Sequence, residues 1–184
     1  MLSKETILLA ENWETVEDIL ETQRKLRDEL STFLVSLGGQ LQQSGWWNKG
    51  WNFIKQSDEQ IYIAHSHWRK NGDKPEYVFW IGVESFNPNA LFGRQSDQQL
   101  YLWVNRDPSL TTTLRTMVAE KKVVLPGESV DRPQGYIVRK FIPKILPNEV
   151  ARFGEIVSPI IIDFFTECAD QEAILSRIAA RSKK

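Results

Sequence analysis

Six of the seven tryptophans lie between Trp46 and Trp103, in the part of the chain that also has the pattern of a β-sheet. An indole combines a large apolar area with one N–H donor, so such a cluster belongs either to a core or to a binding face. Strand-like runs alternate here with turn signals, of which Asn71-Gly72 is the clearest. The runs predict antiparallel strands at residues 60–68, 77–86 and 98–105, with further strands at 51–56 and 135–142.

Helical patterns flank this region on both sides. Between residues 12 and 37, apolar side chains recur every three or four positions, which predicts one long amphipathic helix that ends at Gly38-Gly39. Asp107-Pro108 predicts the start of an inserted helix, because Asp caps helices and Pro suits the first turn. The pattern predicts a single α+β domain over residues 1–184: an antiparallel sheet of four to five strands, with helices packed on it. Its parts are a helical N-terminal arm at 1–45, the sheet region at 46–142 and C-terminal helices at 148–181.

Charge and composition narrow the classes of function. The net charge of −1 gives no general attraction for nucleic acid or an acidic membrane. The charge is uneven, however: residues 1–45 carry four basic and eight acidic side chains, and residues 106–147 carry eight basic and four acidic ones. The one cysteine, Cys168, excludes an intrachain disulfide and is expected to be buried in a helix. With neither a signal-peptide pattern nor a membrane-spanning stretch, we expect a cytoplasmic protein without membrane contact.

The two histidines form the pattern His65-Ser66-His67. Residues two apart in a strand point to the same face, so both imidazoles would be placed to bind one metal ion. A complete site needs a third ligand, and Glu84 projects toward the far end of the predicted hairpin. The sequence therefore predicts no metal and no cofactor, with His65 and His67 as the candidates should a metal be present.

A second candidate chemistry comes from Glu120-Lys121-Lys122, which resembles the Glu-x-Lys half of the PD-(D/E)xK nuclease pattern. The resemblance implies metal-dependent cleavage of nucleic acid, with Asp97 or Asp107 as the upstream carboxylate. The match departs from that family because the segment ends a predicted helix instead of lying on a strand, and because neither aspartate forms a Pro-Asp pair.

The aromatic and basic residues favour binding over catalysis. Three tryptophans, Trp46, Trp47 and Trp51, stand in a loop rich in Gly and Asn, where burying all of them is difficult. An exposed aromatic patch usually marks an interface. A basic rim is expected beside the strand aromatics, formed by Arg132, Arg139 and Lys140 next to Tyr101 and Trp103.

The leading hypothesis is thus a non-catalytic binding module that acts through a Trp-rich sheet surface with a basic edge, as part of a protein complex. The long acidic helix exceeds what a small sheet covers, so self-association or a protein partner is expected. Two alternatives stay open: a metal-dependent nuclease-like enzyme, and a single-stranded nucleic-acid binder, both of a type found in prokaryotic defence.

Overall fold

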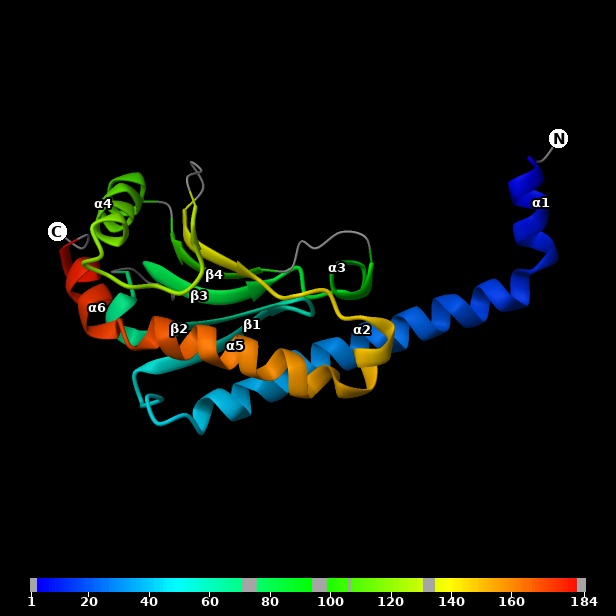
Figure 1. Ribbon diagram of the computed structural model, residues 1–184, viewed down its shortest axis with the longest axis horizontal. Coiled ribbons are helices and arrows are strands. Elements are labelled where there is room, and N and C mark those ends of the chain that lie inside the picture. Colours follow the sequence, from blue (N-terminus) through cyan, green and yellow to red (C-terminus); the bar gives the residue numbers. More distant parts are fainter. Residues whose placement is uncertain (1–2, 71–75, 94–98, 106, 131–134, 182–184) are drawn as a thin grey trace.

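A computed structural model describes residues 3–70, 76–93, 99–105, 107–130 and 135–181 (Figure 1). The α+β class is confirmed: long N-terminal helices precede an antiparallel sheet, and helices follow it. The sheet has six strands, where the sequence predicted four or five.

All strand pairs in the sheet are antiparallel, and the spatial order is β1-β2-β3-β4-β6-β5. The strands are β1 (Trp51–Ser57), β2 (Gln60–His65), β3 (Phe79–Glu84), β4 (Gln99–Val104), β5 (Glu128–Ser129) and β6 (Tyr136–Phe141). The additional strand is the two-residue β5, which pairs with β6 at the edge of the sheet. Gly127 has φ of 90°, and a Cβ there would overlap the carbonyl oxygen of Arg139, so glycine allows β5 to approach β6.

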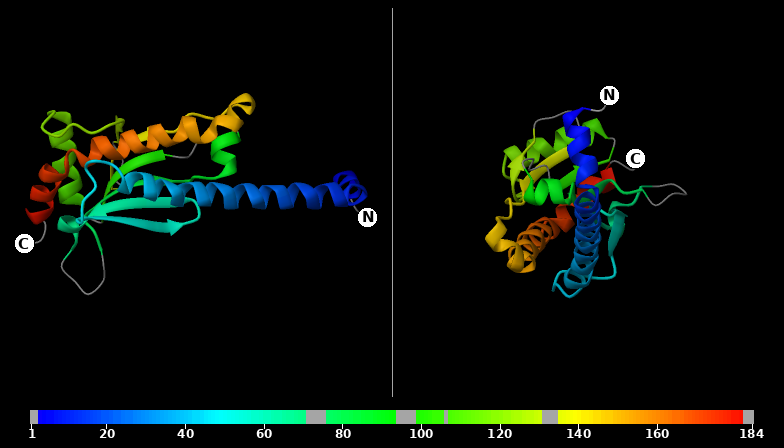
Figure 2. Two further views of the ribbon diagram at one scale, coloured as in Figure 1. Left: turned by 90° about the horizontal axis from the view of Figure 1, so that it is seen from below. Right: turned by 90° about the vertical axis from the view of Figure 1, so that its right-hand side faces the viewer.

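Two helices, α2 (Trp13–Gln42) and α5 (Phe153–Ala169), cover one face of the sheet. The other described helices are α1 (Lys4–Glu11), α3 (Pro88–Phe92), α4 (Pro108–Ala119) and α6 (Glu172–Arg181), with the 3-10 helices η1 (Ser66–Trp68) and η2 (Pro147–Arg152). Figure 2 shows α2 and α5 side by side under the sheet, and their contacts with β2, β3 and β4 agree with this view. Among the described residues, no helix has both the length and the apolarity required to cross a membrane.

The hydrophobic core lies between the sheet and the two helices that cover it, α2 and α5. Alternate strand residues point toward α2 and α5 and are fully buried: Ile61, Ile63, Phe79, Ile81, Val83, Leu100, Leu102 and Val104. The helices contribute Leu34, Leu37 and Leu41 from α2 and Val157, Ile161, Phe164 and Phe165 from α5. Cys168 is buried in α5, as expected, and burial raises the pKa of its thiol, so it serves as a small apolar residue.

The prediction that Gly38-Gly39 ends the first helix is wrong, because α2 continues to Gln42. Gly38 faces the sheet, where the ring of Phe53 on β1 packs directly on its backbone. A Cβ at Gly38 would lie 3.0–3.1 Å from three ring carbons of Phe53, whereas a Cβ at Gly39 would meet nothing within 4 Å. The first glycine is therefore explained by close packing inside a helix, and not by helix termination.

This difference predicts that two neighbouring substitutions have unequal effects on stability. Gly39→Ala is expected to raise the free energy of unfolding by about 0.5–1 kcal/mol, because alanine reduces the backbone entropy lost in a helix. Gly38→Ala is expected to lack this gain, since the Phe53 ring must move away. Urea denaturation of both variants would measure the difference, and equal gains would show that the Phe53 contact imposes no constraint.

The N-terminal part of α2 leaves the body of the molecule. Together with α1 it projects well beyond the sheet, and Figures 1 and 2 show this segment without neighbours. We call residues 4–29 the arm. Burial in α2 begins at Leu30, and none of the arm residues is buried. The expectation that the first helix exceeds what the sheet can cover agrees with this geometry.

Candidate functional site

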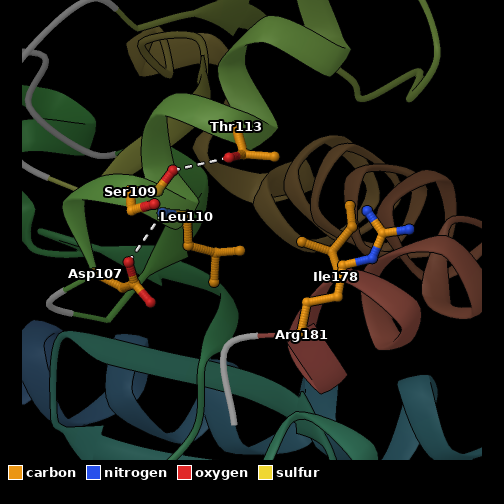
Figure 3. A pocket seen from close by; sticks show the side chains of 6 residues that line it. All are labelled: Asp107, Ser109, Leu110, Thr113, Ile178 and Arg181. Carbon is orange, nitrogen blue, oxygen red and sulfur yellow. Dashed lines mark hydrogen bonds between the residues drawn. The ribbon is translucent and has the colours of Figure 1, made fainter. Parts of the chain in front are cut away.

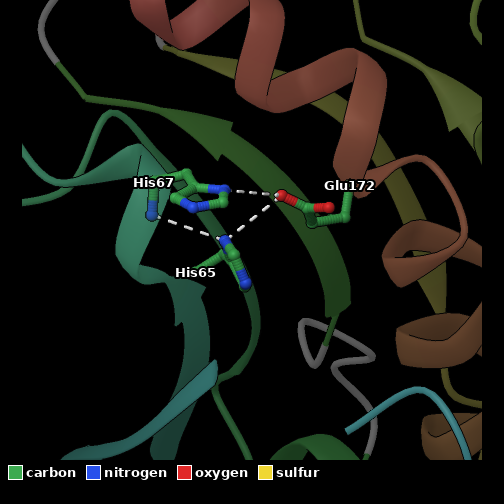
Figure 4. A group of neighbouring side chains, drawn as sticks. All are labelled: His65, His67 and Glu172. Carbon is green, nitrogen blue, oxygen red and sulfur yellow. Dashed lines mark hydrogen bonds and ion pairs between the residues drawn. The ribbon is translucent and has the colours of Figure 1, made fainter. Parts of the chain in front are cut away.

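The two histidines meet at the end of β2. The predicted strand at 60–68 ends at His65, and the chain then turns into η1, which carries His67 back beside His65. The ring centroids lie 4.6 Å apart. A third group, Glu172 in the first turn of α6, faces both rings (Figure 4). Its Oε1 atom lies 3.2 Å from His65 Nδ1 and 3.4 Å from His67 Nδ1.

The sequence did not identify Glu172, which follows His67 by 105 positions in an ordinary helical segment. Glu84, the carboxylate considered instead, accepts hydrogen bonds from the Tyr136 hydroxyl at the far end of β3. Only the packing of α6 against η1 brings the missing carboxylate to the histidines. We call His65, His67 and Glu172 the His–Glu cluster.

The members of the His–Glu cluster differ in exposure. The side chain of His65 is 5% exposed, that of Glu172 is 26% exposed and that of His67 is 69% exposed. Burial lowers the pKa of His65; the Glu172 carboxylate partly opposes this effect, and His67 lowers the pKa slightly further. A lowered pKa keeps the imidazole of His65 neutral at neutral pH, which is the form that binds metal ions.

Neighbouring groups hold the cluster in place. The fully buried Trp68 donates its indole N–H to Ser176 Oγ at 3.0 Å, and the Ser176 hydroxyl contacts Glu172 Oε1 closely. The His65 ring packs edge-on against Trp51, with centroids 5.0 Å apart. Gly50 lies against the Nε2 edge of this ring, and any Cβ there would overlap His65 Nε2. His65 can adopt this orientation because residue 50 is glycine, which has no side chain.

The loop tryptophans are less exposed than the Gly- and Asn-rich loop suggested. Trp51 is 6% exposed, and Trp46 and Trp47 are partly buried. The three rings pack on one another with centroids 5.2–6.4 Å apart, and Trp51 also packs on Trp68. Trp46 donates its indole N–H to Thr166 Oγ1 on α5 at 2.9 Å. The loop therefore closes one end of the core between α2, β1 and α5.

A separate set of aromatic residues lies on the face of the sheet opposite α2 and α5. Trp80 and Trp103 are directly paired across β3 and β4, with ring centroids 4.5 Å apart, and Trp80 stacks on Tyr62 at 4.8 Å. The side chain of Tyr101 lies over Gly82 of the neighbouring strand β3, and its hydroxyl accepts a hydrogen bond from the side chain of Gln60 on β2. We call this the aromatic face. Its tryptophans are only partly exposed, and Trp80 Nε1 is buried without a hydrogen-bond partner among the described residues.

The predicted basic edge is only partly assembled. Arg139 pairs with Tyr101 across β4 and β6 and lies over the ring of Phe141, 5.0 Å from its centroid. Lys140 is the next residue along β6, so it points to the opposite side. Arg132 lies outside the described residues. Of the eight predicted binding residues, Tyr101, Trp103 and Arg139 therefore share one face, and the loop tryptophans lie elsewhere.

The nuclease-like residues do not converge. Asp107 caps α4, where its carboxylate accepts a hydrogen bond from Leu110 N–H and borders a pocket of about 280 Å³ between α4 and α6 (Figure 3). Glu120 lies beyond the other end of this 12-residue helix, about 18 Å away at 1.5 Å per residue, and pairs with Lys122 at 2.6 Å. Two carboxylates so far apart cannot share an ion. Asp97 lies outside the described residues.

An apolar groove lies at the base of the arm. It has a volume of about 380 Å³ and is lined mainly by Leu26, Phe92, Ile145, Leu146, Pro147 and Val150. Leu146 and Val150 are 50% and 46% exposed. The arm itself carries further exposed apolar side chains: Ile7, Leu8, Leu9, Trp13, Ile19 and Leu20, each 43–62% exposed.

Comparisons with models of known protein families, with curated proteins and with solved structures find no match to this chain.

Proposed function

We propose that this protein is an interaction module that binds a protein partner through its arm, and that the partner is a second copy of the same chain. The observation that carries the proposal is the continuity of the apolar stripe on α2. The stripe packs in the core at Leu30, Leu34, Leu37 and Leu41, then continues on the same side of the helix through the half-buried Leu26 and Val16 to the exposed Leu20 and Trp13. An exposed apolar stripe of this length marks an interface.

The charges on the arm favour a second copy as the partner. From Glu5 to Glu21 the charged residues are all acidic, whereas Arg24, Lys25 and Arg27 form a basic group close to the body. Antiparallel pairing of two arms about a two-fold axis places the acidic stretch of each copy beside the basic group of the other. Such an isologous contact is the commonest way for soluble chains to self-associate.

The dimensions of the arm agree with this arrangement. If the axis passes near Leu20, Trp13 of one copy lies opposite residues 27–28 of the other, where the apolar groove begins. The tip of one arm then covers the groove at the base of its partner's arm, so the exposed Leu146 and Val150 are buried by the same contact.

The test is the mass of the full chain in solution, measured by multi-angle light scattering up to about 100 μM. We expect the wild-type protein to have twice the chain mass and the double variant Ile19→Glu/Leu20→Glu to be a monomer, because two buried charges oppose the contact. Thr32→Glu/Ser36→Glu is the matched control: it adds the same charge at exposed positions of α2 away from the stripe and should leave the dimer intact. A monomeric wild-type protein would refute the proposal, as would equal loss of the dimer in both variants.

The aromatic face is a second candidate surface, supported by the Nε1 atom of Trp80, which is buried and has no hydrogen-bond partner in the described part of the chain. A ligand that supplies an acceptor there would satisfy this N–H. Among the described strand residues on this face Arg139 is the one cation, and Glu84 lies nearby, so the charge favours a protein ligand over single-stranded nucleic acid. Binding that weakens steeply with added salt would reverse this preference.

A further inference from the structure

The cluster at the end of β2 has the composition of a transition-metal site. It joins two imidazoles and one carboxylate, and the three candidate ligand atoms lie within 4.8 Å of one another. These are the ligand types that Zn²⁺ and similar borderline ions prefer, whereas Mg²⁺ and Ca²⁺ prefer sites made only of oxygen. We propose that His65, His67 and Glu172 bind one divalent transition-metal ion of the zinc class, independently of the function of the arm.

The distances in the cluster fit such an ion. A tetrahedral ion with bonds of about 2.0–2.1 Å separates neighbouring ligand atoms by about 3.3–3.4 Å. Glu172 Oε1 lies 3.2 Å from His65 Nδ1 and 3.4 Å from His67 Nδ1, so two of the three distances between ligand atoms match this spacing. The third distance, between the two histidine nitrogens, is at most 4.8 Å, and a turn of the His67 ring, which is 69% exposed, would shorten it.

The surroundings supply the support that metal sites require. Ligating groups are normally held by hydrogen bonds from residues behind them, and loss of such support costs about 10–100-fold in affinity. Here Trp68 and Ser176 hold Glu172, while Trp51 and Gly50 both pack against the His65 ring. Because His67 faces solvent, water or an external ligand would complete the coordination.

The metal also has a structural consequence. His65 and His67 belong to the sheet and η1, and Glu172 belongs to α6, so one ion would join two segments that are far apart in the sequence. An ion that binds only the folded chain raises its stability according to its concentration and affinity. Zinc should therefore raise the temperature of unfolding.

The experiment uses untagged full-length protein freed of metal by a chelator, then titrated with ZnCl₂ in a calorimeter. We expect one saturable site per chain, with a higher melting temperature in the presence of zinc. CoCl₂ provides an independent readout, because cobalt bound by two imidazoles and a carboxylate in a tetrahedral site absorbs in the visible range.

Three variants and one control decide the assignment. His67→Ala and Glu172→Gln each remove a ligand and should weaken zinc binding at least 100-fold; His67 is exposed, so its variant should fold normally. Gly50→Ala keeps all three ligands but displaces His65, and should weaken binding about 10–100-fold. Glu167→Gln removes an exposed carboxylate from α5 and should change nothing.

The results of these titrations distinguish a metal site at the His–Glu cluster from zinc binding elsewhere. Loss of binding in the ligand variants with the control unaffected supports the site. Absence of saturable binding in the wild-type protein overturns it, and so does zinc binding that survives both His67→Ala and Glu172→Gln, because the ion would then bind elsewhere. The arm experiment is independent, since neither ligand variant alters residues 4–29.

Discussion

Replacing Trp68 with alanine is expected to lower the free energy of unfolding by about 3–5 kcal/mol, as large-to-small changes of buried aromatics do. The side chain is fully buried, and its ring packs edge-on against both Trp51 and Phe79, at 5.1 and 5.7 Å between centroids. Whole domains are stable by only about 5–15 kcal/mol, so this one change removes a large share of the total. Urea denaturation with a chelator present, which excludes any contribution from bound metal, is the measurement.

The companion variant Trp68→Phe separates the ring from its hydrogen bond. Phenylalanine keeps most of the apolar contact but leaves Ser176 without the indole donor, so a loss of about 1–2 kcal/mol is expected. A loss in Trp68→Ala no larger than in Trp68→Phe would mean that the cavity is filled by relaxation, and that the packing around Trp68 contributes less than its burial implies.

Gly82→Val is expected to destabilise the sheet by about 1–3 kcal/mol, although valine is intrinsically favoured in strands. A Cβ at this position would lie 2.7 Å from Cζ and Oη of Tyr101, and 3.0 Å from the carbonyl oxygen of Ile61. The tyrosine ring cannot simply move aside, because it is almost fully buried and its hydroxyl is bonded to Gln60. Glycine is thus required on β3 because the neighbouring strand places an aromatic ring over it.

A double-mutant cycle tests this explanation directly. In the background of Tyr101→Ala the space above Gly82 is open, so the added cost of Gly82→Val should be much smaller than in the wild-type protein. Thermal or urea denaturation of the four proteins gives the coupling energy. An equal cost in both backgrounds would place the strain in the backbone of β3 or at Ile61, and the explanation from Tyr101 would be wrong.

The local pattern of apolar, capping and turn residues in the sequence was sufficient to predict most of the fold. The alternation around Ile81 and Leu102 identified β3 and β4, and the Asp107-Pro108 pair identified the start of α4. The errors arise where a long-range contact overrides a local rule. Gly38 resembles a helix stop in the sequence, but the ring of Phe53 requires glycine there within the helix. The two-residue strand β5 is too short to have a pattern of its own.

The candidate sites were harder to predict for the same reason. The loop of Trp46 and Trp47 looks exposed because its neighbours in sequence are Gly and Asn, yet Trp46 bonds to Thr166, 120 positions away. The histidine pair was recognisable, but Glu172 has no distinguishing feature until α6 packs against η1. By contrast, the unusual length and acidity of the first helix were visible in the sequence, and the arm is their structural counterpart.

The placement of the covering helices has a consequence for the growing polypeptide. All but one of the strand pairings join strands that follow directly along the chain, so the sheet can assemble as it leaves the ribosome. The buried side of α2 can pack on β1 and β2 soon after these strands are made, because they follow it directly along the chain. The parts of β3 and β4 that α5 covers must wait until α5 is made, about 50 residues after β4, which at translation rates of about 5–20 residues per second takes several seconds. During that interval the nascent chain displays apolar strand residues of the kind that chaperones bind.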